Sequence, residues 1–171
     1  ANPSLAYSAL PNEQLRALEA ALFMIGYDLG QDKSKQQGNA DQLSTQSVQN
    51  EEGWIDCYTR ANGQAFLYRL AETGIQTKKG DGSSSIFFSY DDMLATLLKL
   101  KKDFCAEAFP LANSADQVPA GTAQNGLGMA YYTVTRKSPP FTSRLAAVLE
   151  DMGIFIAEEG LGSKHWRLNL A

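Results

Sequence analysis

Apolar residues recur every three or four positions in four stretches of the chain, a pattern that predicts four amphipathic helices. They cover residues 13–29, 64–73, 91–102 and 138–152. Asn12 is a favourable N-cap for the first helix, and Gly30 and Gly74 are stop signals for the first and second. Asp91 and Asp92 lie at the positive end of the third helix, where acidic side chains are stabilising.

A second pattern, in which β-branched and aromatic residues cluster or alternate with polar ones, predicts six strands. They cover residues 53–60, 75–79, 85–90, 127–136, 154–159 and 164–170. Asp81-Gly82 supplies the turn of one hairpin, and residues 160–163 supply the turn of another. Polar residues dominate 31–52 and 110–127, which we interpret as long loops. This mixture of helices and hairpins predicts an α+β fold.

Two stretches carry the same landmarks in the same order, which predicts an internal repeat. The first contains Thr59-Arg60, Phe66-x-x-Arg69-Leu70-Ala71, Gly74-Ile75 and Gly80-x-Gly82-Ser83. The second contains Thr135-Arg136, Phe141-x-x-Arg144-Leu145-Ala146, Gly153-Ile154 and Gly160-x-Gly162-Ser163. The alternative is a coincidence of common helix, turn and strand signals. We predict two pseudo-repeats, 1–90 and 91–171, each running helix–loop–strand–helix–hairpin, packed into one domain.

Composition is that of an ordinary globular domain, with 171 residues, 44% of them hydrophobic and 20% charged. No apolar run reaches the roughly 18–20 residues of a membrane-spanning helix, so we expect no membrane span. The net charge of −4 disfavours bulk binding of nucleic acid, which usually leaves a basic footprint. The compartment stays open between the cytoplasm and export as a mature chain.

The chain has two cysteines, Cys57 and Cys105, and one histidine, His165. A structural zinc site needs about four ligands at recurring spacing, so we expect no metal. The cysteines either form one disulfide or remain two buried free thiols, and the sequence leaves both open. Cys57 with His165 is the candidate nucleophile–base pair, which gives a small Cys/His enzyme as a second alternative function.

Other signatures of catalysis or cofactor binding are weak. Residues 80–83 lie in a predicted hairpin turn, whereas phosphate loops join a strand to a helix. We interpret Asp91-Asp92 as a helix start and Glu150-Asp151 as a solvated helix face. We therefore expect no catalytic residue and no cofactor.

The predicted helix and hairpin from Phe66 to Tyr90 resemble the recognition helix and wing of winged-helix DNA-binding proteins. The resemblance implies that Arg69 lies on the helix and that Lys78 and Lys79 lie on the wing, where they would contact phosphates. It covers about 25 residues. A predicted strand precedes the helix, and the corresponding second hairpin is acidic at Glu158-Glu159, so the match is partial.

These observations favour a non-enzymatic domain that binds another protein, because the chain is acidic, rich in aromatic residues and poor in catalytic motifs. The aromatic residues are expected to be mainly core, and those exposed together would mark a binding surface: Trp54, Tyr58, Tyr131, Tyr132 and Trp166. The alternative is a winged-helix-like protein that binds nucleic acid. Its candidate contacts are Arg60, Arg69, Lys78, Lys79, Arg136 and Arg144.

Overall fold

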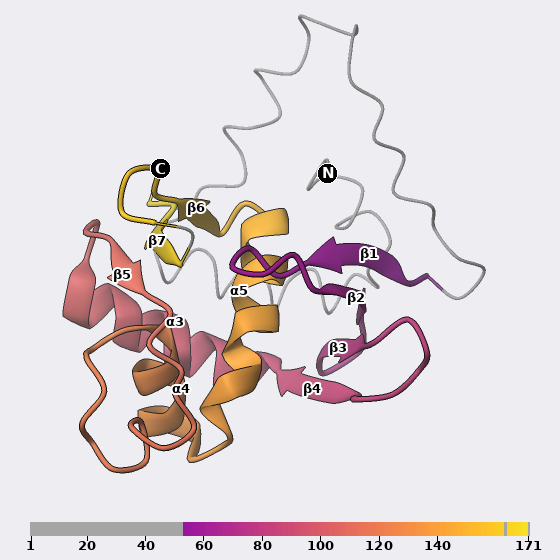
Figure 1. Ribbon diagram of the computed structural model, residues 1–171, viewed down its shortest axis with the longest axis horizontal. Coiled ribbons are helices and arrows are strands. Elements are labelled where there is room, and N and C mark those ends of the chain that lie inside the picture. The colour runs from indigo at the N-terminus through magenta and orange to yellow at the C-terminus, as the bar shows by residue number, and fades with distance from the viewer. Residues whose placement is uncertain (1–52, 163, 171) are drawn as a thin grey trace, which may run out of the picture.

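The computed structural model describes residues 53–162 and 164–170 (Figure 1). The helix predicted over 13–29 and the loop predicted over 31–52 lie outside these residues. The described part contains three α-helices, one 3-10 helix and seven strands in two antiparallel sheets. This confirms the predicted α+β class.

The first sheet is an antiparallel meander in which each strand pairs with the next along the chain. Its strands are β1 (Ile55–Tyr58), β2 (Ala65–Leu70), β3 (Gly74–Lys78) and β4 (Ile86–Ser89). The hairpin predicted around Asp81-Gly82 is confirmed as β3 and β4. One face is buried, because alternate residues such as Phe66, Tyr68 and Ile75 point into the core.

The helix predicted over 64–73 is wrong, because most of this segment is β2. Phe66 and Tyr68 are two positions apart and both are buried, which is the spacing of one strand face. β2 also pairs with β1 on one side and β3 on the other. These two ladders satisfy its backbone and outweigh the helix-like spacing of Phe66 and Leu70.

Helix α3 (Tyr90–Phe104) begins one residue before the predicted start at Asp91. The Ser89 hydroxyl caps it by accepting a hydrogen bond from the Asp92 backbone N–H at 3.2 Å. Acidic residues lie in its first turn and Lys101 and Lys102 in its last, each matching the helix dipole. The predicted helix is therefore confirmed.

Helix α4 (Leu127–Thr135) replaces the strand predicted over 127–136, so that strand prediction is wrong. Tyr131, Thr133 and Thr135 alternate in sequence, but the buried residues Leu127, Ala130 and Tyr131 follow helical spacing. The Thr133 and Thr135 hydroxyls donate to carbonyls four residues earlier, at 2.7 and 2.8 Å. This back-bonding satisfies both hydroxyls within the helix, and the helical burial pattern of the apolar residues accounts for the helix itself.

Helix α5 (Thr142–Asp151) follows a 3-10 turn, η2 (Pro139–Phe141), and confirms the helix predicted over 138–152. It contacts β1 of the first sheet and β6 (Phe155–Ala157) of the second. Six consecutive residues, 144–149, are buried, so the helix is enclosed on most sides. Figure 1 shows it between the two sheets.

The second sheet has the order β5-β7-β6, with β5 (Phe109–Pro110) and β7 (His165–Leu168). Strands β6 and β7 confirm the second predicted hairpin. β5 is a short strand that the sequence did not predict, since Pro110 lies at the start of the expected loop. Its two residues pair with Trp166 and His165.

The structure does not confirm the internal repeat, because the shared landmarks lie in elements of different kinds. Phe66 and Arg69 are in strand β2, whereas Phe141 is in η2 and Arg144 is in helix α5. The two hairpins, β3–β4 and β6–β7, are the landmarks that match. The boundary at residue 90 stays a prediction, and residues on both sides of it share one hydrophobic core.

None of the helices in the described ranges combines the length and apolar character needed to cross a membrane.

Candidate functional site

An open pocket with a volume of about 570 Å³ lies between strand β1 and the C-terminal half of helix α5. Residues 56–60 line it from β1 and the turn after this strand, together with Gly63. Ala147, Glu150 and Asp151 line it from α5. These three positions have i, i+3, i+4 spacing, so one face of the helix forms the opposite wall.

The turn after β1 fixes the strand beside this pocket. The Thr59 N–H donates to the Gln64 carbonyl at 3.0 Å, and the Gln64 N–H donates to Thr59 Oγ1 at 3.0 Å. In an antiparallel ladder, residues alternate between those bonded to the neighbouring strand and those facing away. Because Thr59 is bonded to the β2 side, the backbone groups of Asp56 and Tyr58 face away from β2. β1 is an edge strand among the described elements.

Glu150 joins three elements at the pocket. Its carboxylate accepts a hydrogen bond from Arg60 Nη1 at 2.9 Å and another from Trp166 Nε1 at 2.7 Å. The first bond ties the turn after β1 to α5, and the second ties α5 to β7. Both carboxylate oxygens of Glu150 therefore have partners.

Asp151 interacts with the buried side of β1 and β2. The Tyr68 hydroxyl donates to Asp151 Oδ2 at 2.5 Å. Burial raises the pKa of Tyr68, and the nearby Asp151 carboxylate raises it further. Burial, followed by the charge of Asp151, also raises the pKa of the Cys57 thiol to about 12. Both groups are therefore protonated at neutral pH.

The two residues of the Cys/His alternative lie on different sheets. Cys57 is a buried pocket residue of β1, whereas His165 is on β7 opposite Pro110. Within the described residues, His165 Nδ1 is buried and has no hydrogen-bond partner, Cys57 included. Both cysteines are free. Cys57 is buried, as the free-thiol alternative expects, but Cys105 is exposed, so that part of the expectation is wrong.

The structure brings together two of the six basic residues singled out from the sequence. Arg69 Cζ and Lys78 Nζ lie 4.6 and 4.1 Å from the centroid of the Trp54 ring. Arg69 Nε also donates to Gln76 Oε1 at 2.6 Å. Strand alternation puts Arg69 and Lys78 on the sheet face that points away from the core.

The other four basic residues have separate roles. Arg60 lies at the pocket, and the backbone N–H of Lys79 closes the β3–β4 turn with a hydrogen bond of 2.9 Å. Arg136 is the left-handed C-cap of α4 and lies over the Tyr132 ring. Arg144 is a buried residue of α5.

Arg144 is 5% exposed, and burial lowers its pKa. It donates to the Ser84 carbonyl at 2.6 Å, the Ser84 hydroxyl at 3.0 Å and Thr77 Oγ1 at 3.4 Å. These bonds fasten the β3–β4 turn to α5. The expected recognition helix is strand β2, so the described residues lack the helix-and-wing arrangement of the winged-helix resemblance.

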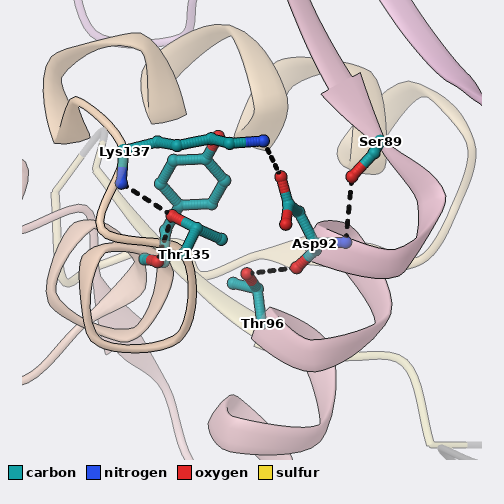
Figure 2. Close-up of polar contacts among 6 residues, drawn as sticks. Ser89, Asp92, Thr96, Thr135 and Lys137 are labelled. Atoms are coloured by element: carbon teal, nitrogen blue, oxygen red, sulfur yellow. Dashed lines mark hydrogen bonds and ion pairs between the residues drawn. The ribbon is translucent and has the colours of Figure 1, made fainter.

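A second polar cluster joins α3 to the end of α4 (Figure 2). Lys137 Nζ forms an ion pair with the Asp92 carboxylate, and the Lys137 backbone N–H donates to Thr135 Oγ1 at 3.0 Å. The Thr96 hydroxyl donates to the Asp92 carbonyl at 2.7 Å, and Ser89 caps the helix. Because these groups satisfy one another, we assign the cluster to helix packing.

Of the five aromatic residues, Trp54, Tyr131 and Trp166 are buried and Tyr132 is half-buried. Tyr58 is 63% exposed and lines the pocket, so it is the aromatic residue of that set available to a partner.

The interpretation of Glu150-Asp151 as a solvated helix face is wrong, because both carboxylates bond buried aromatic side chains at the pocket. One signal could have identified them. Carboxylates at a helix C-terminus face the negative end of the dipole, and the last turn of α5 has no basic residue to offset this. Acidic residues in such a position indicate partners elsewhere in the fold.

Comparison with protein-family models, with curated proteins and with solved structures finds no match for this chain.

Proposed function

We propose that this chain is a non-enzymatic domain that binds another protein at the pocket between β1 and α5. The observation that carries the proposal is the pocket itself, which an edge strand borders on one side and a helix on the other. Edge strands and helix-lined grooves are both common sites for a protein segment to dock.

The protonation states of the side chains at the pocket support a binding function rather than a catalytic one. A nucleophilic cysteine needs a lowered pKa, whereas the pKa of Cys57 is raised to about 12. The Tyr68 hydroxyl donates to Asp151, and both oxygens of Glu150 accept hydrogen bonds. These groups hold the pocket in shape and leave its buried residues without an activated nucleophile.

The exposed aromatic residue supports a protein partner. Tyr58 combines a large contact area with a hydroxyl and few rotatable bonds, and tyrosine is enriched at the residues that dominate interface energies. The pocket lining carries three carboxylates, those of Asp56, Glu150 and Asp151, against one guanidinium. This acidic lining would repel the phosphates of nucleic acid, which favours the protein-binding function over the nucleic-acid alternative.

The test is a selection of peptides displayed on phage against the immobilised full chain, followed by affinity measurement through fluorescence anisotropy. We expect Tyr58→Ser to lower the affinity for the selected peptides by about tenfold or more, as the loss of an interface hot spot does. The matched control is Leu161→Ser, because Leu161 is 56% exposed in the β6–β7 turn, away from the pocket. Its effect should be below about twofold. Peptides that bind both variants equally well would overturn the proposed site.

A further inference from the structure

We propose that the partner enters the pocket as an extended segment carrying lysine or arginine, which adds as a further strand to the edge of β1 that no described strand pairs with. This inference rests on the protein-binding function proposed above and names the class of ligand. It joins two observations, the direction of the β1 backbone groups and the charge of the pocket lining.

The backbone of β1 provides hydrogen-bonding groups for an added strand. The N–H and C=O groups of Asp56 and Tyr58 face away from β2, two residues apart along the strand. An added strand satisfies such a row with main-chain hydrogen bonds, as in other cases of strand addition. The Tyr58 N–H lies near the Cys57 thiol, a weak acceptor that a peptide carbonyl can replace.

The helix gives the segment a second wall. Ala147 is the small residue of the α5 face, and Glu150 and Asp151 lie one turn later on the same face. Because side chains of an extended segment alternate, every second one would point toward α5 and the others toward Tyr58. The groove between β1 and α5 would therefore contact both sets of side chains of the segment, while main-chain hydrogen bonds to β1 would fix the register of the segment.

The charge of the lining selects a basic segment. Glu150 has partners on both oxygens, whereas within the described residues Asp151 accepts a side-chain hydrogen bond on Oδ2 alone. The Asp56 side chain is exposed, and in the same part of the chain it forms no ion pair. The C-terminal end of α5 adds the negative end of a helix dipole. A lysine or arginine in the groove would meet these carboxylate oxygens, whereas an acidic segment would be repelled.

The experiment uses two end-capped peptides, Thr-Lys-Val-Lys-Val-Lys-Thr and its counterpart with glutamate in place of lysine, titrated by fluorescence anisotropy against the full chain. We expect the lysine peptide to bind with a Kd below about 1 mM and the glutamate peptide to show no binding. No binding of the lysine peptide up to that concentration overturns the inference.

Matched charge variants separate the groove from general attraction to an acidic protein. The double variant Glu150→Gln with Asp151→Asn should lower the affinity for the lysine peptide about tenfold, because roughly one charge-assisted contact is lost. The control, Asp116→Asn with Glu159→Gln, removes the same charge from two exposed residues and should change affinity by less than about threefold. Equal weakening by both pairs overturns the assignment to the groove.

A scan of N-methylated peptides tests the strand itself and uses the native protein, so it does not depend on a variant that folds. Methylation of alternate amides should weaken binding about tenfold, while the amides between them should tolerate it, because a strand presents N–H groups to its neighbour at every second residue. Uniform tolerance overturns strand addition. It leaves the protein-binding proposal intact, since that proposal depends on Tyr58 and on selected peptides.

A second copy of this chain is the competing occupant of the β1 edge. Analytical ultracentrifugation should find the protein monomeric at about 50 μM, and Asp56→Pro, which removes an outward N–H, should leave its mass unchanged. A dimer that Asp56→Pro dissociates would assign the edge to self-association and overturn the inference.

Discussion

Residues 66–75 and 141–154 share the sequence Phe-x-x-Arg-Leu-Ala with a later Gly-Ile, yet the first begins as a strand and the second as a helix. The difference lies in the neighbouring residues. Tyr68 occupies one of the variable positions in the first segment, so three alternate residues from Phe66 are apolar. The second segment comes directly after Pro139-Pro140, which favour the first turn of a helix.

The residues on the C-terminal side of the shared motif separate the two segments further. After Arg144 the chain continues with five apolar residues, 145–149, which bury a helix between two sheets. After Arg69 the chain reaches a turn within four residues, so a short strand is the element that fits. A short motif thus takes its geometry from its flanks and its packing partners. The two phenylalanines and two arginines consequently meet different surroundings, and this can be measured.

The largest expected contrast is between the phenylalanines. Phe66→Ala should lower the free energy of unfolding by about 3–5 kcal/mol, because Phe66 is 2% exposed and its removal leaves a cavity in the core. Phe141 is partly buried at the margin of the same core, so Phe141→Ala should cost about 1–2 kcal/mol. Urea unfolding monitored by circular dichroism measures both. Equal costs would show that the two positions are packed alike.

A smaller contrast is expected between the arginines. Arg144→Met should destabilise the fold by about 2–3 kcal/mol, because it removes three hydrogen bonds and leaves the Ser84 carbonyl without its donor. Arg69→Met keeps most of the contact with Trp54 and loses a hydrogen bond to Gln76, so we expect about 1 kcal/mol or less. The same unfolding measurement applies, and a larger effect at Arg69 would reverse the expected order.

A third contrast concerns the reactivity of a thiol rather than stability. Cys57 corresponds to Thr133 when the two segments are aligned on Thr59 and Thr135. In a Cys105→Ser background, iodoacetamide at pH 8 should alkylate Cys57 at least about 100-fold more slowly than an exposed thiol, because its pKa is about 12. The matched exposed thiol is a Thr133→Cys variant that also carries Cys57→Ala and Cys105→Ser. Similar alkylation rates would contradict the burial of Cys57.

The same thiol gives a pH dependence with a defined sign. Its pKa in the folded state, about 12, exceeds the 9.0 of an unperturbed thiol, so deprotonation favours the unfolded chain. The stabilising contribution is complete below pH 9 and is lost as pH rises toward 12. Cys57→Ala should therefore make the free energy of unfolding fall less steeply between pH 9 and pH 12. The same dependence on pH in the variant and in the unmodified protein would contradict a raised pKa for Cys57.

The sequence predicted the elements whose boundaries carry their own signals. The acidic pair Asp91-Asp92 marks the start of α3, and Asp81-Gly82 marks the β3–β4 turn. The failures at 64–73 and 127–136 have a common cause, because their apolar residues fit both a period of two and a period of three or four. Strand pairing for β2 and helix packing for α4 decided between these periods, and neither is visible in a local window.

The pocket could be predicted in part. Cys57 and Arg60 were singled out from the sequence, for other reasons, and both line it. Glu150 and Asp151 gain their role from Trp166 and from Tyr68, which lies 83 residues from Asp151 along the chain. Proximity of that kind comes from the packing of β1 and β2 against α5, which composition and periodicity do not encode.

The placement of β5 has a consequence for the order in which the protein folds. Each strand of the first sheet pairs with its neighbour in sequence, so those ladders close short loops at small entropic cost. β5 pairs with β7, and α4, α5 and β6 all lie between them in the chain. Contacts between residues that are far apart in the sequence form slowly. During synthesis we therefore expect the meander to begin pairing early, while Phe109 and its apolar surroundings stay uncovered until β7 has emerged.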